Sequence, residues 1–175
     1  MPRNDPVLAG SVCLALVCEG EVHGWAVASA LAPGTELGRI WSLSRPLTYR
    51  ALDGLVEDGL TERRGTEPGR GRARTVLAAT RRGRAANDRW LATPVSHPRD
   101  VRTELLLKLE LLDRRGRSPV DLLLAQRAAF ASVFDSLRSV PADTIDGIWR
   151  HEHITAIRRF LDRSIDLAET GGASR

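Results

Sequence analysis

The sequence is poor in lysine and cysteine, and each scarcity excludes a class of protein. Only one of its 26 basic residues is a lysine, and its two cysteines are Cys13 and Cys18. Two cysteines are too few for a disulfide scaffold. Five residues turn a helix by roughly 500°, so the two thiols face different ways and make a poor metal pair. His151 and His153, two residues apart on a helix, also face different ways and make a poor metal pair. We therefore predict free thiols and no metal site.

The familiar motifs of catalysis are also missing. The sequence contains no G-x-x-x-x-G-K-[ST], no complete G-x-G-x-x-G, no H-E-x-x-H and no G-x-S-x-G. Lys108, the one lysine available for Schiff-base chemistry, lies among leucines. We expect its stem to pack while its amine reaches water. These observations argue against an enzyme, and we predict neither catalytic residues nor a cofactor.

No apolar run in the sequence is long enough to cross a bilayer. The uncharged stretch VLAGSVCLALVC, residues 7–18, is far shorter than the roughly 20 residues that a membrane helix needs. Asp5 and Pro6 precede it, and no A-x-A cleavage site follows, so it does not read as a signal peptide. We therefore predict a buried first helix, no membrane partner and a cytoplasmic location.

Arginine, by contrast, is abundant and clustered. Residues 63–89 hold nine arginines against two carboxylates, an excess of seven, whereas the whole chain has a net charge of +4. Within that segment lies EPGRGRAR, residues 67–74, with three arginines, two glycines and a proline. Proline and glycine let a loop bend and let its backbone approach another molecule closely. Positive charge gathered in this way permits an anionic partner.

The first half of the sequence predicts short helices and one β-hairpin. Helices are expected at 6–18, 23–34, 44–59 and 81–92, and β-prone segments at 60–66 and 74–80. Ser44 as N-cap, Pro46 in the first turn and Gly59 near the end delimit the third helix. Three helices, a hairpin and a closing helix make a winged helix-turn-helix, with EPGRGRAR at the tip of the wing.

The second half is expected to be entirely helical. TPVSHPR, residues 93–99, marks a boundary, and helices are predicted at 101–116, 120–137 and 143–168. Their broad apolar stripes need partners, and a second chain would supply some of them. The fold class is therefore mainly α with a small β-hairpin. The predicted parts are a DNA-binding domain at 1–92, a linker at 93–98, and a C-terminal α-helical dimerisation and effector domain at 99–175.

Side chains near the start of the third helix suit DNA recognition. A helix-turn-helix lays its second helix in the major groove, with its N-terminal residues facing base edges. In this chain those positions are Ser44, Arg45, Thr48, Tyr49 and Arg50. Arginine reads guanine through paired hydrogen bonds, and hydroxyls reach phosphates or bases. We predict that these five residues contact double-stranded DNA.

The arginines of the wing suit the DNA backbone. We predict that Arg70, Arg72 and Arg74 lie along the backbone or enter the minor groove, and that each contact releases counterions. Arg63 and Arg64, on the first strand, are further candidates. A purely structural interpretation stays open for several residues: Tyr49 in the core, Ser44 as a cap alone, or the wing merely solvated.

Several segments in order resemble the PadR family of bacterial transcriptional regulators. They are HGW at 23–25, LGRIWSLSRPLTYRALDGLVEDGL at 37–60, the GRGRAR wing, TRRGRAANDRWL and VRTELLLKLELLD. The resemblance covers roughly residues 7–170. It implies a homodimer joined through its C-terminal helices, and a repressor of nearby genes that a small phenolic or drug-like effector relieves. It also implies DNA contacts at Ser44, Thr48, Tyr49, Arg70 and Arg72, although relatives often have glycine where this chain has Pro46.

The sequence therefore predicts a dimeric, sequence-specific, nucleoid-associated repressor with a roughly palindromic operator and a small aromatic effector. Half-sites would lie about 10 bp apart, or a multiple of that. The alternative is a winged-helix protein-interaction module that does not bind DNA. For the effector, Phe130, Phe134 and Trp149 could line a cavity, and core packing explains them as well. We leave the ligand-binding residues unassigned.

Overall fold

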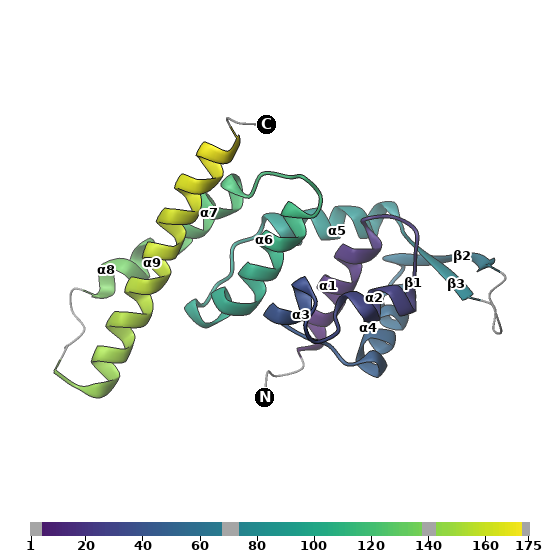
Figure 1. The fold of residues 1–175 in the computed structure, drawn as a ribbon, viewed down its shortest axis with the longest axis horizontal. Helices are drawn as coiled ribbons and strands as arrows, with labels where there is room; N and C mark the ends of the chain where they lie inside the picture. Colours follow the sequence, from purple (N-terminus) through teal and green to yellow (C-terminus); the bar gives the residue numbers. More distant parts are fainter. Residues whose placement is uncertain (1–4, 68–73, 138–142, 173–175) are drawn as a thin grey trace.

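The computed structural model describes residues 5–67, 74–137 and 143–172, and it shows a chain of helices with a small sheet at one end (Figure 1). The N-terminal part contains α1 (Pro6–Val17), β1 (Val22–His23), α2 (Gly24–Ala30), α3 (Glu36–Ile40), α4 (Arg45–Glu57), β2 (Thr61–Glu67), β3 (Arg74–Ala79) and α5 (Arg81–Ala92). The predicted mainly α fold with a winged helix-turn-helix is confirmed.

Helix α1 forms the centre of the N-terminal part. The Asp5 carboxylate caps it by accepting hydrogen bonds from the backbone N–H groups of Val7, at 2.9 Å, and Leu8, at 3.4 Å. Every side chain from Val12 to Val17 is buried, because α1 contacts α2, α4, α5, α6 and β3. Burial raises the pKa of the Cys13 thiol to about 12, and both cysteines are free, as predicted. An all-round apolar helix is typical of such a central position.

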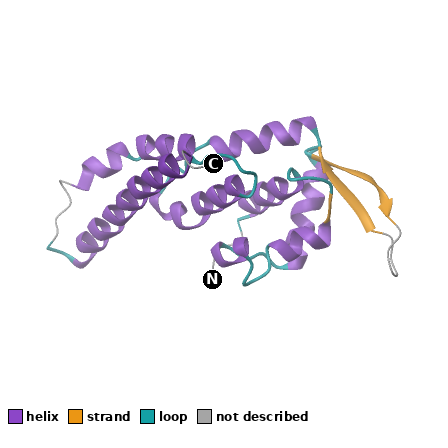
Figure 2. Ribbon diagram, turned by 45° about the horizontal axis from the view of Figure 1, so that its top comes forward, coloured by secondary structure: helices purple, strands orange, loops and turns teal. Residues whose placement is uncertain are grey.

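The sheet has three antiparallel strands in the order β1-β3-β2 rather than the two of the predicted hairpin. Val22 pairs with Leu77, and His23 with Val76, although the sequence predicted a helix that begins at His23. A two-residue strand is too short to show a periodic pattern, which is why it was missed. The sheet projects from the helices (Figure 2), so the described part of the wing stands at one end of the molecule.

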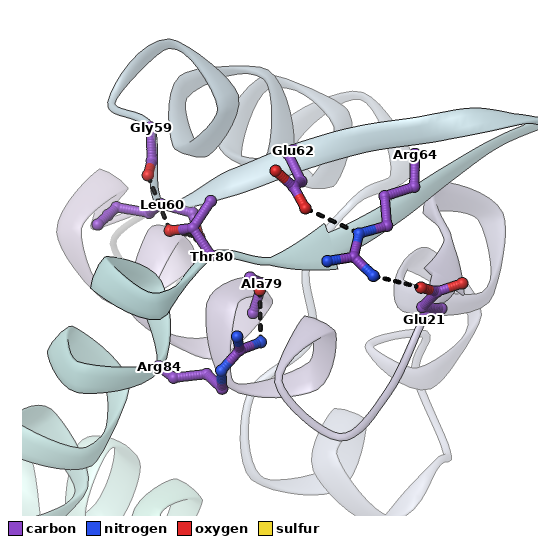
Figure 3. A network of polar contacts seen from close by, with 8 residues as sticks. All are labelled: Glu21, Gly59, Leu60, Glu62, Arg64, Ala79, Thr80 and Arg84. Carbon is purple, nitrogen blue, oxygen red and sulfur yellow. Dashed lines mark hydrogen bonds and ion pairs between the residues drawn. The ribbon is translucent and has the colours of Figure 1, made fainter.

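Two helix starts share the pattern T-x-x-G. Thr35 caps α3 and Thr80 caps α5, each by accepting a hydrogen bond of 3.0 Å from a glycine N–H three residues on. Each threonine hydroxyl also donates to a backbone carbonyl of the preceding segment, as Thr80 does to Gly59 (Figure 3). A Cβ on the second glycine, Gly83, would lie 2.0 Å from the Leu60 carbonyl oxygen. Glycine is therefore required for α5 to abut the start of β2.

The described residues of the C-terminal part form helices joined by short turns and loops. Its elements are η1 (Pro98–Asp100), the π-helical turn η2 (Val101–Leu105), α6 (Leu106–Asp113), α7 (Val120–Ala129), α8 (Ala131–Ser136) and α9 (Ile145–Gly172). The predicted helix at 120–137 is divided at Phe130 into α7 and α8. Helix α9 packs along α7 and α8, and it buries Ile154, Ile157, Leu161 and Ile165.

Buried polar groups join the two parts. The Lys108 ammonium, 1% exposed, donates to Glu104 at 2.8 Å and to the Thr93 carbonyl at 2.7 Å, and it lies 5.0 Å from the Trp90 ring centroid. Trp90 Nε1 donates to the same Glu104 oxygen at 2.9 Å. The prediction that this amine reaches water is therefore wrong, because α5 and η2 enclose it and supply its partners. A second link comes from the Gln126 amide, which bonds both backbone groups of Val95, accepting at 2.7 Å and donating at 3.0 Å.

Within these described residues, no helix is long and apolar enough to span a membrane. Nor does any group of three or more histidine, cysteine or acidic side chains there form a metal-binding cluster.

Candidate nucleic-acid interface

Helix α4 presents one polar face outwards and one apolar face inwards. Leu52 and Leu55 are buried against the rest of the N-terminal part, at 2% and 5% exposure. Ser44, Arg45, Tyr49 and Arg50, four of the five residues predicted on this helix, are exposed together at its N-terminal end. Within the described residues, neither Arg45 nor Arg50 takes part in an ion pair. The two guanidinium groups are therefore available to an anion.

Tyr49 lies at the junction of the two helices of the helix-turn-helix. The residue is 42% exposed, so the alternative of a core tyrosine does not hold. A Cβ added to Gly24, the first residue of α2, would lie 2.8 Å from Tyr49 Cε1. The glycine thus leaves room for one edge of the ring, while the rest of the ring faces solvent. Sequence reasoning did not connect Gly24 with Tyr49, although the HGW segment contained the signal.

Thr48 differs from its neighbours because it is fully buried, at 0% exposure. Its hydroxyl donates to the Ser44 carbonyl at 3.1 Å. A buried side chain does not reach a ligand outside the protein, so the direct DNA contact predicted for Thr48 does not fit its position. Ser44 occupies the N-cap position, and within the described residues its side chain makes no capping hydrogen bond. Its hydroxyl therefore remains exposed at the start of α4.

The arginines on the first wing strand are paired with carboxylates. Arg63 Nη2 lies 2.7 Å from Asp53 Oδ1 of α4. Arg64 lies between Glu62, at 2.8 Å, and Glu21, at 3.1 Å (Figure 3). Hydrogen bonds to Glu62 and Glu21 raise the pKa of the Arg64 guanidinium. Sequence reasoning missed these partners, because Arg63 and Asp53 come from different elements.

The remaining wing residues of the prediction fall at the limit of the described structure. Arg70 and Arg72 lie outside the described residues. Arg74 opens β3, where its backbone pairs with Glu67, and its side chain lies outside the described part. Strand β2 lies beside α4, where Arg63 pairs with Asp53. The described part of the wing therefore adjoins the exposed face of α4.

A second exposed surface lies on α9, and it is apolar. Ile145, Ile148 and Trp149 are 90%, 50% and 65% exposed, and the Trp149 ring stacks on His153 with centroids 5.4 Å apart. Phe130, by contrast, is 1% exposed and packs edge-on against Phe134 at 6.1 Å. For Phe130, core packing is the interpretation that the structure supports.

A hollow of about 690 Å³ lies between α6 and the C-terminal half of α9. Ile40 of α3 reaches it from the N-terminal part, and Leu106, Leu109, Leu123 and Leu167 supply much of its apolar wall. Glu110, Asp113 and Arg117 add charge to the lining. Its volume falls in the range of small-molecule sites.

Comparison with known proteins gives structural matches only. No protein-family model matches the sequence, and a search of curated proteins gives no match. Among solved structures, Bacillus subtilis PadR in complex with operator DNA is 20% identical, with a TM-score of 0.47 over 92% of this chain and 96% of PadR. The chain resembles PadR. Free PadR is 18% identical, with a TM-score of 0.46 and coverage of 97% and 96%. PadR with p-coumaric acid is also 18% identical, with a TM-score of 0.45 and coverage of 96% and 95%.

Proposed function

We propose that the chain is a DNA-binding transcriptional regulator of the PadR type that acts as a dimeric repressor. The observation that carries the proposal is the exposed N-terminal face of α4, next to β2, where Ser44 and Tyr49 accompany Arg45 and Arg50, two arginines that make no ion pair with any described residue. Helices presented in this way read base edges in the major groove. The family resemblance of the sequence supports the same function, located in the bacterial cytoplasm on the nucleoid and without catalysis.

The proposed contacts follow from exposure and charge. Arg45 and Arg50 donate to guanine or phosphate, while Tyr49 and Ser44 add hydroxyl and ring contacts. Thr48 has a different role, since its buried hydroxyl braces the first turn of α4 against Ser44. Arg70, Arg72 and Arg74 are proposed as contacts of the wing with the DNA backbone, on the evidence of the sequence alone.

The apolar face of α9 supports the proposed homodimer. Three large apolar side chains lie exposed at the start of this helix. Such a face resembles the core of a protein interface, which is typically apolar and aromatic. A two-fold dimer would present two α4 helices to a roughly palindromic operator. We accordingly propose residues 1–92 as the DNA-binding part, 93–98 as the connection and 99–175 as the part that dimerises and holds the effector.

The hollow between α6 and α9 is the proposed effector site. An apolar molecule there would touch Ile40 of the N-terminal part and Leu167 of α9 together. Its binding would therefore favour one arrangement of the two parts over another. The occupant that fits is a small, mainly apolar, aromatic molecule whose polar group faces Glu110 or Arg117. A phenolic acid that binds the wild type and not a Leu109→Arg variant would support this site.

Binding to the DNA upstream of its own coding sequence tests the main proposal. Electrophoretic shifts repeated across salt concentrations should show affinity falling steeply, because each neutralised phosphate contributes about 0.9 to the slope of log K against log salt. A double substitution of Arg70 and Arg72 with alanine should flatten that slope.

The alternative, a protein-interaction module, makes the opposite prediction. Failure to retain any duplex in an unbiased selection from genomic DNA, together with a specific protein partner captured from lysate, would favour it. In that case the α4 face would belong to a protein interface.

A further inference from the structure

The arginines near α4 fall into two groups according to their partners. Arg45 and Arg50, on the helix, have no ion-pair partner within the described residues. Arg63 and Arg64, on β2, are each held by carboxylates of the same chain. A count of the arginines therefore overstates the positive charge that this region has available to bind DNA.

The pair between Arg63 and Asp53 lies at the border of the proposed interface. Asp53 follows Tyr49 by four residues, about one helical turn, so both occupy the same exposed side of α4. The Asp53 carboxylate is 61% exposed, the Arg63 side chain is 53% exposed, and 2.7 Å separates the bonded atoms. An acid at this position would face the phosphates that flank the recognition helix.

A carboxylate and a phosphate compete for the same guanidinium. Both accept paired hydrogen bonds from arginine, and both carry negative charge. An exposed ion pair is weak and is screened by salt, so it can open when a stronger acceptor arrives. While Asp53 is paired with Arg63, however, the carboxylate offsets the charge of this arginine and weakens its attraction to a phosphate.

We propose that Asp53 holds Arg63 back from the DNA backbone and so lowers the affinity of the chain for any duplex. The inference rests on the proposed function, and it adds a residue that limits sequence-independent binding. Phosphate contacts carry no sequence information, so a restrained Arg63 leaves recognition to the exposed side chains of α4. Asp53 thereby lowers the affinity of the protein for non-specific DNA.

Four variants and two duplexes test the proposal. The variants are Asp53→Asn, Arg63→Ala, the double variant, and Glu57→Gln as a control. Glu57 is an exposed carboxylate on the same helix, and the described structure gives it no arginine partner, so its loss removes equal charge and releases no cation. The duplexes are the upstream DNA and a random sequence of equal length.

Asp53→Asn should bind the random duplex at least about threefold more tightly at low salt, and its slope of log K against log salt should steepen by about 0.9. Arg63→Ala should change affinity little, and the double variant should lose the gain. An equal gain in Glu57→Gln, or a gain that persists in the double variant, would overturn the inference, because charge repulsion alone would then explain it. If the wild type binds the upstream duplex and Asp53→Asn binds DNA no more tightly than the wild type does, the inference alone is overturned. If the wild type binds neither duplex, the proposed function is overturned as well.

Discussion

Two helices of this chain, α4 and α9, each expose an aromatic side chain, but the neighbours of that side chain differ. Tyr49 on α4 is 42% exposed and lies beside Arg45 and Arg50. Trp149 on α9 is 65% exposed and lies beside isoleucines. An exposed aromatic ring by itself does not indicate the kind of partner, whereas its neighbours do.

The physical difference lies in what each face would lose on binding. Cations around Tyr49 would displace the counterions condensed on a nucleic acid, so their binding to a polyanionic partner would depend on salt. Isoleucines around Trp149 would lose only water, so binding of an apolar partner there would depend on the area buried. The chain thus separates a cationic surface from an apolar surface and places them in different parts of the molecule (Figure 1).

The largest effect should come from a charge placed in the apolar face. Trp149→Glu should weaken self-association by about 100-fold, because an interface that buries this ring would have to bury a carboxylate. Sedimentation over a range of concentrations measures the dissociation constant. Glu169→Ala, on an exposed position of the same helix, is the control and should leave it unchanged. Unaltered dimerisation of Trp149→Glu would remove the contrast between the two helices.

The next effect concerns the polar link between the two parts. Lys108→Met keeps the packed stem but leaves the Thr93 carbonyl and Glu104 without the ammonium. The free energy of unfolding should fall by about 2 kcal/mol, as expected for unpaired groups at a buried position. Urea denaturation measures the change, with the exposed Arg102→Met as control. Equal stability of the two variants would show that the link does not stabilise the junction.

A smaller effect should distinguish the two helices by charge. Arg45→Ala should lower affinity for the upstream duplex about 10-fold, the size of one good contact between arginine and a base, without changing self-association. Arg163→Ala makes the same change on an exposed position of α9 and should leave DNA affinity almost unaltered. Fluorescence anisotropy compares them, and equal losses would contradict the assignment of DNA binding to α4.

The smallest effect tests how Tyr49 is positioned. Gly24→Ala adds a methyl group 2.8 Å from the ring edge, so the tip of the tyrosine must move. Because the ring can turn towards solvent, we expect little loss of stability and roughly a threefold loss of DNA affinity, a fraction of one base contact. Gly20→Ala is the control, since nothing lies within 4 Å of its added carbon. A thermal melt and a binding titration together separate the two quantities.

Local signals in the sequence predicted much of this fold. Ser44 and Pro46 placed the start of α4 correctly, and Gly59, with a φ of +66°, follows its end as expected. The predicted helix at 81–92 is confirmed as α5, with Thr80 as its cap. These features depend on a few neighbouring residues, which is why the sequence alone reveals them.

Features that depend on distant residues were harder to predict. Arg63 meets Asp53 only after β2 folds back beside α4, so its charge could not be discounted beforehand. The burial of Thr48 was open to prediction, because Thr48, Leu52 and Leu55 follow the helical spacing of the inward face. Lys108 lies four residues after Glu104, a spacing that favours an ion pair, yet the enclosure by Trp90 comes from another helix.

Val95, held at both its N–H and its C=O by one glutamine, has a consequence for how the molecule can rearrange. Gln126 acts as a single residue of a neighbouring strand would, so the connecting peptide has one register on α7 rather than a continuum of positions. A shift of this peptide by even one residue would leave the buried amide of Gln126 without its donor and its acceptor on the backbone. Any rearrangement that crosses this peptide must therefore either carry α7 along with it or proceed as a discrete jump.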